Sequence, residues 1–178
     1  FKKYPIFKHF SFDYFLVMPT AFSFPHEKDK WDFLDSLKIL FSKIDNSQVI
    51  VHKPHNGMHG DHFASKKYMK LIEMIKFFPF LFKIFKATIK ISPRFIKIIL
   101  PKLYTAHLYS AILNRTIPLK NFTDKSYIAV EAFYPYVKKG IIGGLSNTIW
   151  GSLFHKIPFY KVLDETKQNR SASNKLYG

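Results

Sequence analysis

The sequence contains no cysteine, which excludes disulfide bonds, thiolate metal sites and cysteine nucleophiles. Acidic residues are also few, because 12 aspartates and glutamates stand against 28 lysines and arginines, a formal net charge of +16. A field of this sign attracts anions such as nucleic acid, phospholipid headgroups and nucleotide-sugars. No charge-free apolar run reaches the length of about eighteen residues that a bilayer requires, so we expect no membrane-spanning helix.

Apolar and aromatic side chains are abundant, at 47% and 18% of the 178 residues. This content excludes a disordered chain and is sufficient for the core of one domain of ordinary size. The first residue is Phe1 rather than a methionine, and we expect 1–178 to be a single domain taken from a longer protein. Its last segment, 164–178, is polar and is expected to be a tail.

Short apolar runs alternate with helical patterns along the chain, which is typical of an α/β domain with a parallel sheet. We expect a strand at 13–20, a helix at 26–44 and a strand at 48–52, which together make one right-handed β-α-β unit. Further elements are predicted as strands at 127–130, 140–143 and 157–163, a turn at 135–139 and a helix at 146–155. The sequence therefore predicts a Rossmann-like parallel sheet flanked by helices.

A basic and aromatic segment, 66–103, interrupts this pattern and is predicted to be a helical insertion. Its cations from Lys83 to Lys97 recur every three or four residues, which places them on one helical face, and its single acid is Glu73. Three prolines are expected to divide the segment into short helices: Pro79, Pro93 and Pro101.

The insertion has three interpretations. Large apolar residues surround its helices instead of forming one stripe, which favours binding at an anionic membrane interface. A nucleic-acid surface is not expected, because no recognised RNA-binding signature is present. Packing within the protein, either between domains or on the sheet with the lysines in water, stays open.

Two predicted strand ends carry polar residues of the kind that bind ligands. The residues that follow strand 48–52 are Lys53, His55 and Asn56, and those that follow strand 140–143 are Gly144, Ser146, Asn147 and Thr148. Strand ends of an open α/β sheet form the crevice in which ligands bind. An ammonium with an imidazole, opposite a glycine-serine turn that opens a helix, would hold a phosphate. The alternatives are a plain turn with a solvated lysine and an ordinary helix cap.

Glu131 follows the strand predicted at 127–130 and is a further candidate. Its carboxylate would accept hydrogen bonds from a ribose or sugar hydroxyl, although it would equally serve as a surface acid near Lys138.

A metal site is the main alternative at the first strand end. The histidines in question, with one acid, are His52, His55, His59, Asp61 and His62. Residues 59–62 match the last part of the His-x-His-x-Asp-His signature of metallo-β-lactamase-like hydrolases, but Gly57 stands where the first histidine would be. The spacing of His55, His59 and His62 would suit one helical face, whereas Gly57 and Gly60 disfavour a helix.

These motifs resemble the carboxy-terminal half of bacterial GT-B glycosyltransferases, in particular the sialyltransferases and polysialyltransferases of capsule and lipooligosaccharide synthesis. Lys53-Pro54-His55 resembles the family's Lys-Pro-His-Pro motif, with Asn56 in place of the second proline. Ser146-Asn147-Thr148 resembles its serine or serine-threonine pair after a glycine-ended strand, with a departure at the middle residue. The likeness covers most of the chain except 66–103.

The resemblance implies transfer of a sugar, with sialic acid from CMP-sialic acid as one candidate donor, to a surface glycan acceptor. His55 would contact the donor phosphate, and Ser146 and Thr148 would hold it from the other side. No cofactor is implied beyond the nucleotide-sugar, and the expected location is the cytoplasmic face of the inner membrane. The family's catalytic base belongs to its amino-terminal domain. We therefore name no base and expect weak nucleotide binding without turnover from these residues alone.

Overall fold

A computed structural model describes residues 11–19, 23–24, 26–53, 63–121, 129–144 and 148–162. Within these residues, five strands form one sheet in the order β3-β2-β1-β4-β5, and all neighbouring strands are parallel. The strands are β1 (Phe12–Val17), β2 (Ile50–Lys53), β3 (Ile117–Pro118), β4 (Val137–Gly143) and β5 (Phe159–Lys161). This order is that of a Rossmann-like doubly wound sheet. The prediction of an α/β domain with a parallel sheet is therefore confirmed.

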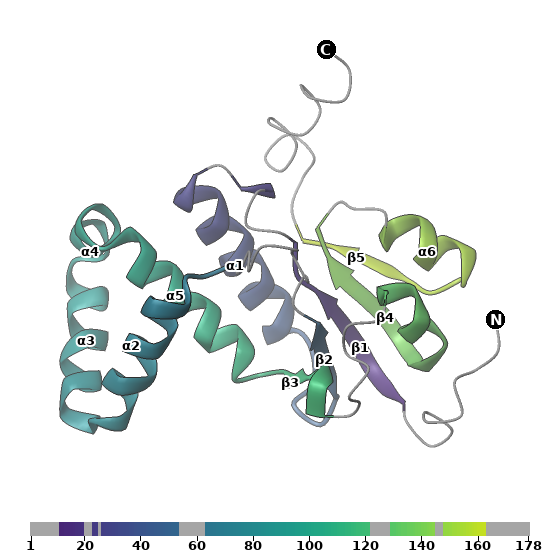
Figure 1. Ribbon diagram of the computed structural model, residues 1–178, viewed down its shortest axis with the longest axis horizontal. Helices are drawn as coiled ribbons and strands as arrows, with labels where there is room; N and C mark the ends of the chain where they lie inside the picture. The colour runs from purple at the N-terminus through teal and green to yellow at the C-terminus, as the bar shows by residue number, and fades with distance from the viewer. Residues whose placement is uncertain are drawn as a thin grey trace, which may run out of the picture.

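Helices cover both faces of the sheet (Figure 1). On one face α1 (Glu27–Ser42) and α5 (Pro101–Leu113) pack over Leu16, Ile50 and Ile142, and we call this the α1 face. The other face, the α6 face, is covered by η4 (Val130–Tyr136) and α6 (Thr148–Phe154), with η3 (Leu119–Asn121) beside them. Its core includes Phe15, Val51 and Ile141 from the strands. Successive strand residues alternate between the two faces, except at the register shift between Phe12 and Tyr14 of β1.

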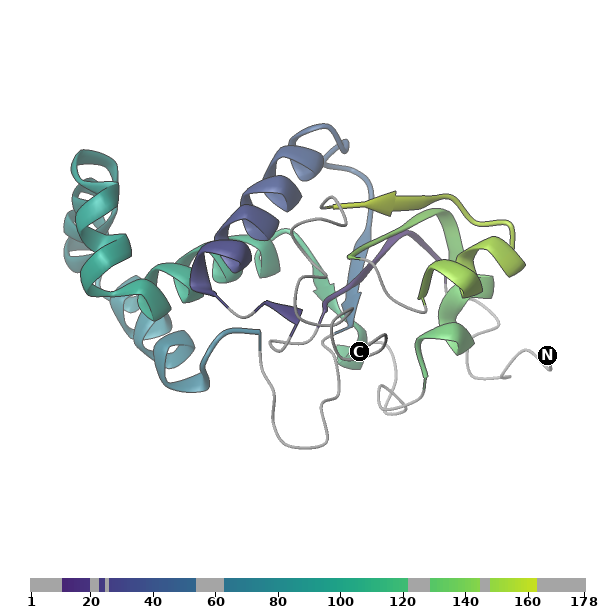
Figure 2. The same cartoon turned by 90° about the horizontal axis from the view of Figure 1, so that it is seen from above.

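The segment between β2 and β3 leaves the sheet as a series of helices (Figure 2). They are α2 (Lys66–Phe77), α3 (Pro79–Ile91), α4 (Pro93–Ile99) and then α5. Each of the last three begins with proline, which supplies no N–H and therefore suits the first helical position. The residue before each proline has a non-helical backbone, which ends the preceding helix. The predicted division of 66–103 is confirmed, and none of the described helices has the length and apolar character needed to cross a bilayer.

Two predictions for the second half of the chain differ from the described structure. Of the strand expected at 127–130, the described part contains no strand, because Val130 begins the 3-10 helix η4. That helix buries Phe133, Tyr134 and Tyr136 in the core of the α6 face, which extended backbone would not do for neighbouring side chains. The turn expected at 135–139 is also absent, since β4 begins at Val137. The third strand is instead the short β3 at the sheet edge.

Candidate functional site

The carboxyl ends of four strands lie side by side at one edge of the sheet. The register pairs Val17 of β1 with Lys53 of β2 and with Gly143 of β4, and it pairs Gly143 with Lys161 of β5. These four residues form one row, which we call the carboxyl-edge row. The order of the strands reverses between β1 and β4, and the crevice at such a reversal is where ligands bind in doubly wound sheets.

The two lysines of the row lie on the same face. Lys53 shares the α6 face with Val51, and Lys161 shares it with Phe159, which packs on the core of that face. Their backbones are three strand spacings apart, about 14 Å, with Val17 and Gly143 between them. One buried and one exposed lysine therefore lie on the two sides of the β1–β4 junction.

Lys53 is a buried cation, with 5% of its surface exposed. Its Nζ lies 5.9 Å from the centre of the Phe133 ring, which is fully buried in the core of the α6 face. Burial lowers the pKa of Lys53, while the nearby carboxylate of Glu131 raises it. A charge in such surroundings interacts strongly with an arriving anion, because the local dielectric constant is low.

Glu131 belongs to the same edge. It lies in the first turn of η4, is exposed, and is close enough to Lys53 for its charge to favour the lysine's protonated form. An exposed carboxylate beside a cation accepts hydrogen bonds from hydroxyl groups, so Glu131 and Lys53 offer an acceptor and a donor to one ligand.

Gly143 contributes no side chain to the row, and its neighbours lie close to its Cα. A Cβ atom at this position would lie 3.2 Å from the carbonyl oxygen of Val17 and 3.6 Å from the Phe159 ring. The Gly143 carbonyl accepts the N–H of Val162 at 3.0 Å, which joins the ends of β4 and β5. Gly144 follows the end of β4 and is buried. The middle of the row therefore consists of the Gly143 backbone with the Val17 side chain and the Phe159 ring beside it.

Several predicted site residues lie outside the described residues. They are His55, Asn56, Ser146 and Asn147, together with the alternative metal ligands His59, Asp61 and His62. Thr148 begins α6, but its side chain is not among those described. The strands from which these residues follow do end at the same edge, as the sequence predicted. Within the described residues, no group of three histidines, aspartates or glutamates is arranged to hold a metal ion.

His52, the first histidine considered for a metal site, lies in the core of the domain. It lies on the α1 face, opposite to Lys53, and its Nδ1 is 2.8 Å from the hydroxyl of Thr116. Burial lowers the pKa of His52 to about 4, and the charge of Lys120 lowers it further. The imidazole is therefore a neutral part of the core at pH 7. Because side chains alternate along β2, His52 points to the opposite face from Lys53.

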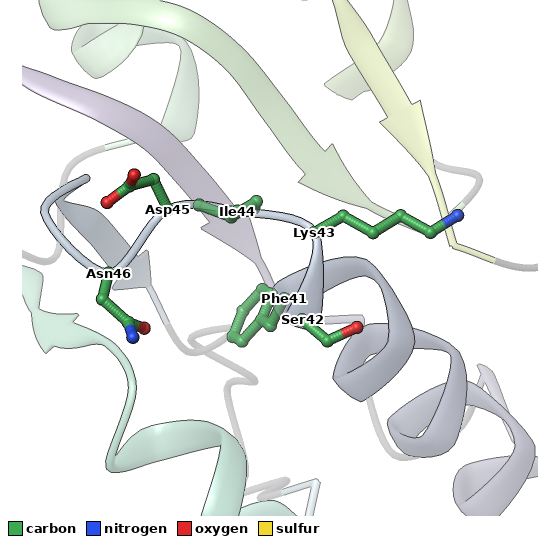
Figure 3. A pocket seen from close by; sticks show the side chains of 6 residues that line it. All are labelled: Phe41, Ser42, Lys43, Ile44, Asp45 and Asn46. Carbon is green, nitrogen blue, oxygen red and sulfur yellow. The ribbon is translucent and has the colours of Figure 1, made fainter.

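Two hollows lie elsewhere. One, of about 580 Å³, surrounds the turn after α1 and is lined by Phe41, Ser42, Lys43, Ile44, Asp45 and Asn46 (Figure 3). It lies at the turn that joins α1 to β2, near the amino ends of the strands and therefore opposite to the carboxyl-edge row. The other, of about 310 Å³, lies between α1 and α5 beside Lys38 and His107. Neither hollow is lined by a residue from the carboxyl end of a described strand.

Lys161 is the functional candidate that sequence reasoning missed. The sequence placed it inside a predicted strand, 157–163, where a lysine has no special meaning. Lys161 is significant because it ends a strand of the parallel sheet. Recognising it requires knowing where that strand ends and which strand it pairs with, and the hydrophobic pattern of the sequence gives neither.

Comparison of the chain with protein-family models, curated proteins and solved structures gives no match in any of the three.

Proposed function

We propose that this domain binds the nucleotide-sugar donor of a glycosyltransferase, as the donor-binding half of a GT-B enzyme that transfers a sugar to a surface glycan. The observation that carries the proposal is the carboxyl-edge row, in which Lys53 and Lys161 flank the β1–β4 crevice on one face of the sheet. The motif likeness of 53–56 and 146–148 adds to it, because both segments follow strands that end in this row.

The carboxyl-edge row would supply positive charge for the phosphate of the departing nucleotide. In sugar transfer, an acceptor oxygen forms a bond to the anomeric carbon while the bond from that carbon to the phosphate oxygen breaks. The electron pair of that bond leaves with the phosphate, whose growing negative charge the ammonium groups of Lys53 and Lys161 would stabilise. Glu131 would accept a hydrogen bond from a ribose or sugar hydroxyl. The acceptor's proton goes to a base that we do not assign to this domain.

Thermal denaturation in the presence of CMP, UDP, GDP, their sugar conjugates and inorganic pyrophosphate tests the proposal. A nucleotide at ten times its Kd stabilises the domain by about 1.4 kcal/mol, which raises Tm by about 3–6 °C. We expect one nucleotide and its sugar conjugate to give this shift, and pyrophosphate to give less. Absence of a shift with every nucleotide, or loss of binding when the sugar is attached, would refute the proposal.

Lys53→Met and Lys161→Met locate the site. Each variant loses a charged hydrogen bond to phosphate, so we expect nucleotide affinity to fall roughly tenfold to a hundredfold. The matched control is Lys43→Met, which removes the same charge from an exposed residue at the opposite edge (Figure 3). If all three variants weaken binding equally, the nucleotide responds only to the net charge and the row is not its site.

The alternative of a metal-dependent hydrolase rests on His55, His59, Asp61 and His62 alone. No described residue adds to that set. Elemental analysis distinguishes the two functions, because stoichiometric zinc or manganese in the purified protein would favour the hydrolase.

A further inference from the structure

Helix α3 carries an apolar face that the domain itself does not cover. None of its residues is buried, and Phe80, Ile84 and Ile91 are 73%, 48% and 83% exposed. At about 100° per residue, these three side chains fall within about 40° of one another around the helix. They therefore form one stripe along the helix, and we call it the α3 stripe.

The lysines of α3 lie next to this stripe. Lys83, Lys86 and Lys90 are all exposed and occupy a second face, about 90° around the helix from the first. The third face, with Phe85 and Ile89, is partly buried and directed toward the rest of the domain. A surface helix of a soluble domain normally has one apolar and one polar face. The α3 stripe is an additional apolar face, bordered by cations.

The same character continues on both sides of α3. At the turn from α2, Phe77 and Phe78 are 79% and 50% exposed, and their rings lie 5.3 Å apart. On α4, Phe95, Ile98 and Ile99 are more than half exposed at three- and four-residue spacing, and the exposed Arg94 lies beside them. The exposed apolar surface therefore extends over three successive elements.

Specific contacts hold these helices to the domain. Lys97 of α4 lies over two rings, 5.3 Å from the centre of Trp31 and 5.2 Å from the centre of Tyr104. The ammonium of Lys76 in α2 donates a hydrogen bond to Ser110 Oγ in α5 at 2.6 Å. Both views place α3 and α4 on the side of the molecule remote from the sheet (Figures 1 and 2). The α3 stripe is therefore presented outward on a fixed support.

We infer that the surface formed by the α2–α3 turn, the α3 stripe and the exposed face of α4 binds an anionic membrane surface. The apolar side chains enter the boundary between headgroups and acyl chains, and the lysines at their border reach lipid phosphates. Charge complementarity decides the occupant, since the only acid between 66 and 103 is Glu73. Protein interfaces are depleted in lysine, and exposed isoleucines do not stack on bases as nucleic-acid sites require.

Co-sedimentation of the whole chain with vesicles tests this inference. We expect binding to phosphatidylcholine vesicles that contain phosphatidylglycerol and little binding to phosphatidylcholine alone. Neutralising Lys83, Lys86 and Lys90 to Gln should lower the partition coefficient by roughly fivefold for each charge removed. Replacing Phe77, Ile84 and Ile91 with Ser should abolish binding without affecting the fold, because all three side chains are exposed.

The matched control is Phe154→Ser, which removes a side chain of equal kind, 75% exposed, from α6 on the other side of the sheet. It should bind vesicles as the parent does. In F77W, vesicles with brominated acyl chains should quench fluorescence more than in the parent, whose tryptophans are Trp31 and Trp150.

Three outcomes would overturn the inference. They are absence of binding to anionic vesicles, equal loss of binding in Phe154→Ser, and a lipid-free dimer that the serine variant converts to monomer. The last outcome would show that a second copy of the chain covers this surface.

Discussion

The position of His52 leads to a measurable dependence of stability on pH. Its pKa is about 4 in the folded protein because the ring is buried, whereas an unfolded histidine has a pKa of 6.5. The unfolded state therefore binds a proton more readily than the native state below pH 6.5. The contribution of His52 to stability is complete above this pH and is lost as the pH falls toward 4. Between pH 8 and pH 5 the loss from this residue is about 2 kcal/mol.

His52→Asn is the variant that isolates this contribution. The shorter amide can still meet the hydroxyl of Thr116, which Nδ1 contacts at 2.8 Å, but it does not titrate. We expect the variant to be less stable at pH 8, because buried volume is lost, and to lose about 2 kcal/mol less than the parent on going to pH 5. Urea denaturation at both pH values measures the difference, which corresponds to a shift of roughly 1 M in midpoint for a slope near 2 kcal/mol per M.

The control is His26→Asn, at the exposed residue that precedes α1. It leaves in place the two buried histidines, His52 and His107, and burial likewise lowers the pKa of His107 to about 4. The dependence on pH that these two residues cause should therefore remain. If His52→Asn has the same dependence as the parent, or if NMR shows His52 titrating near pH 6.5 in the native protein, the ring is not a neutral part of the core.

Three further predictions concern the carboxyl-edge row. Lys53→Met should weaken nucleotide binding and leave the ligand-free protein folded, because methionine fills a similar buried volume without the charge that the ligand needs; thermal denaturation with and without nucleotide measures both. As the pH rises, nucleotide affinity measured by calorimetry should begin to fall below pH 10.5, the ordinary pKa of lysine, because burial lowers the pKa of Lys53. This fall should be absent in Lys53→Met. Glu131→Gln should bind pyrophosphate several-fold more tightly than the parent does, because the negative charge that repels the phosphates is lost. Its preference for nucleotide over pyrophosphate should be smaller, because the contact to a sugar hydroxyl is also lost.

The parts of the fold that the sequence predicts are those whose signals are local. Strands buried on both faces produce continuous apolar runs, so β1 and the end of β4 are evident from 13–17 and 140–143. Prolines are tolerated in the first turn of a helix and not in its interior, so Pro79, Pro93 and Pro101 mark three helix starts within a residue.

The parts that the sequence does not predict depend on tertiary contacts. The run from Val130 to Tyr136 is rich in residues that favour strands, but three of its aromatic rings pack together against the α6 face and stabilise a 3-10 helix. Strand β3 has two residues, and one of them is Pro118, so no periodic pattern can reveal it. Its place at the sheet edge is what tolerates the proline.

The candidate site divides in the same way. Lys53 is recognisable from the sequence, because it directly follows an apolar run that ends before a proline. Its partnership with Lys161 is not, because it depends on the register of β2, β1, β4 and β5, which are distant in the chain. The sequence shows that His52 and Lys53 point to opposite faces of β2, but it does not show which face each one takes. The packing of α5 on one face and of η4 on the other decides this.

The excess of positive charge therefore has two different environments, and salt distinguishes them. Lys83, Lys86 and Lys90 are exposed, so ions screen their attraction to a lipid surface over a Debye length of about 8 Å at physiological ionic strength. Lys53 is buried against Phe133, where dissolved salt screens a charge less than at the surface. Raising the salt concentration should consequently release the domain from anionic vesicles well before it weakens nucleotide binding. Loss of both at the same salt concentration would mean that the nucleotide, like the lipid, binds at exposed lysines rather than at Lys53.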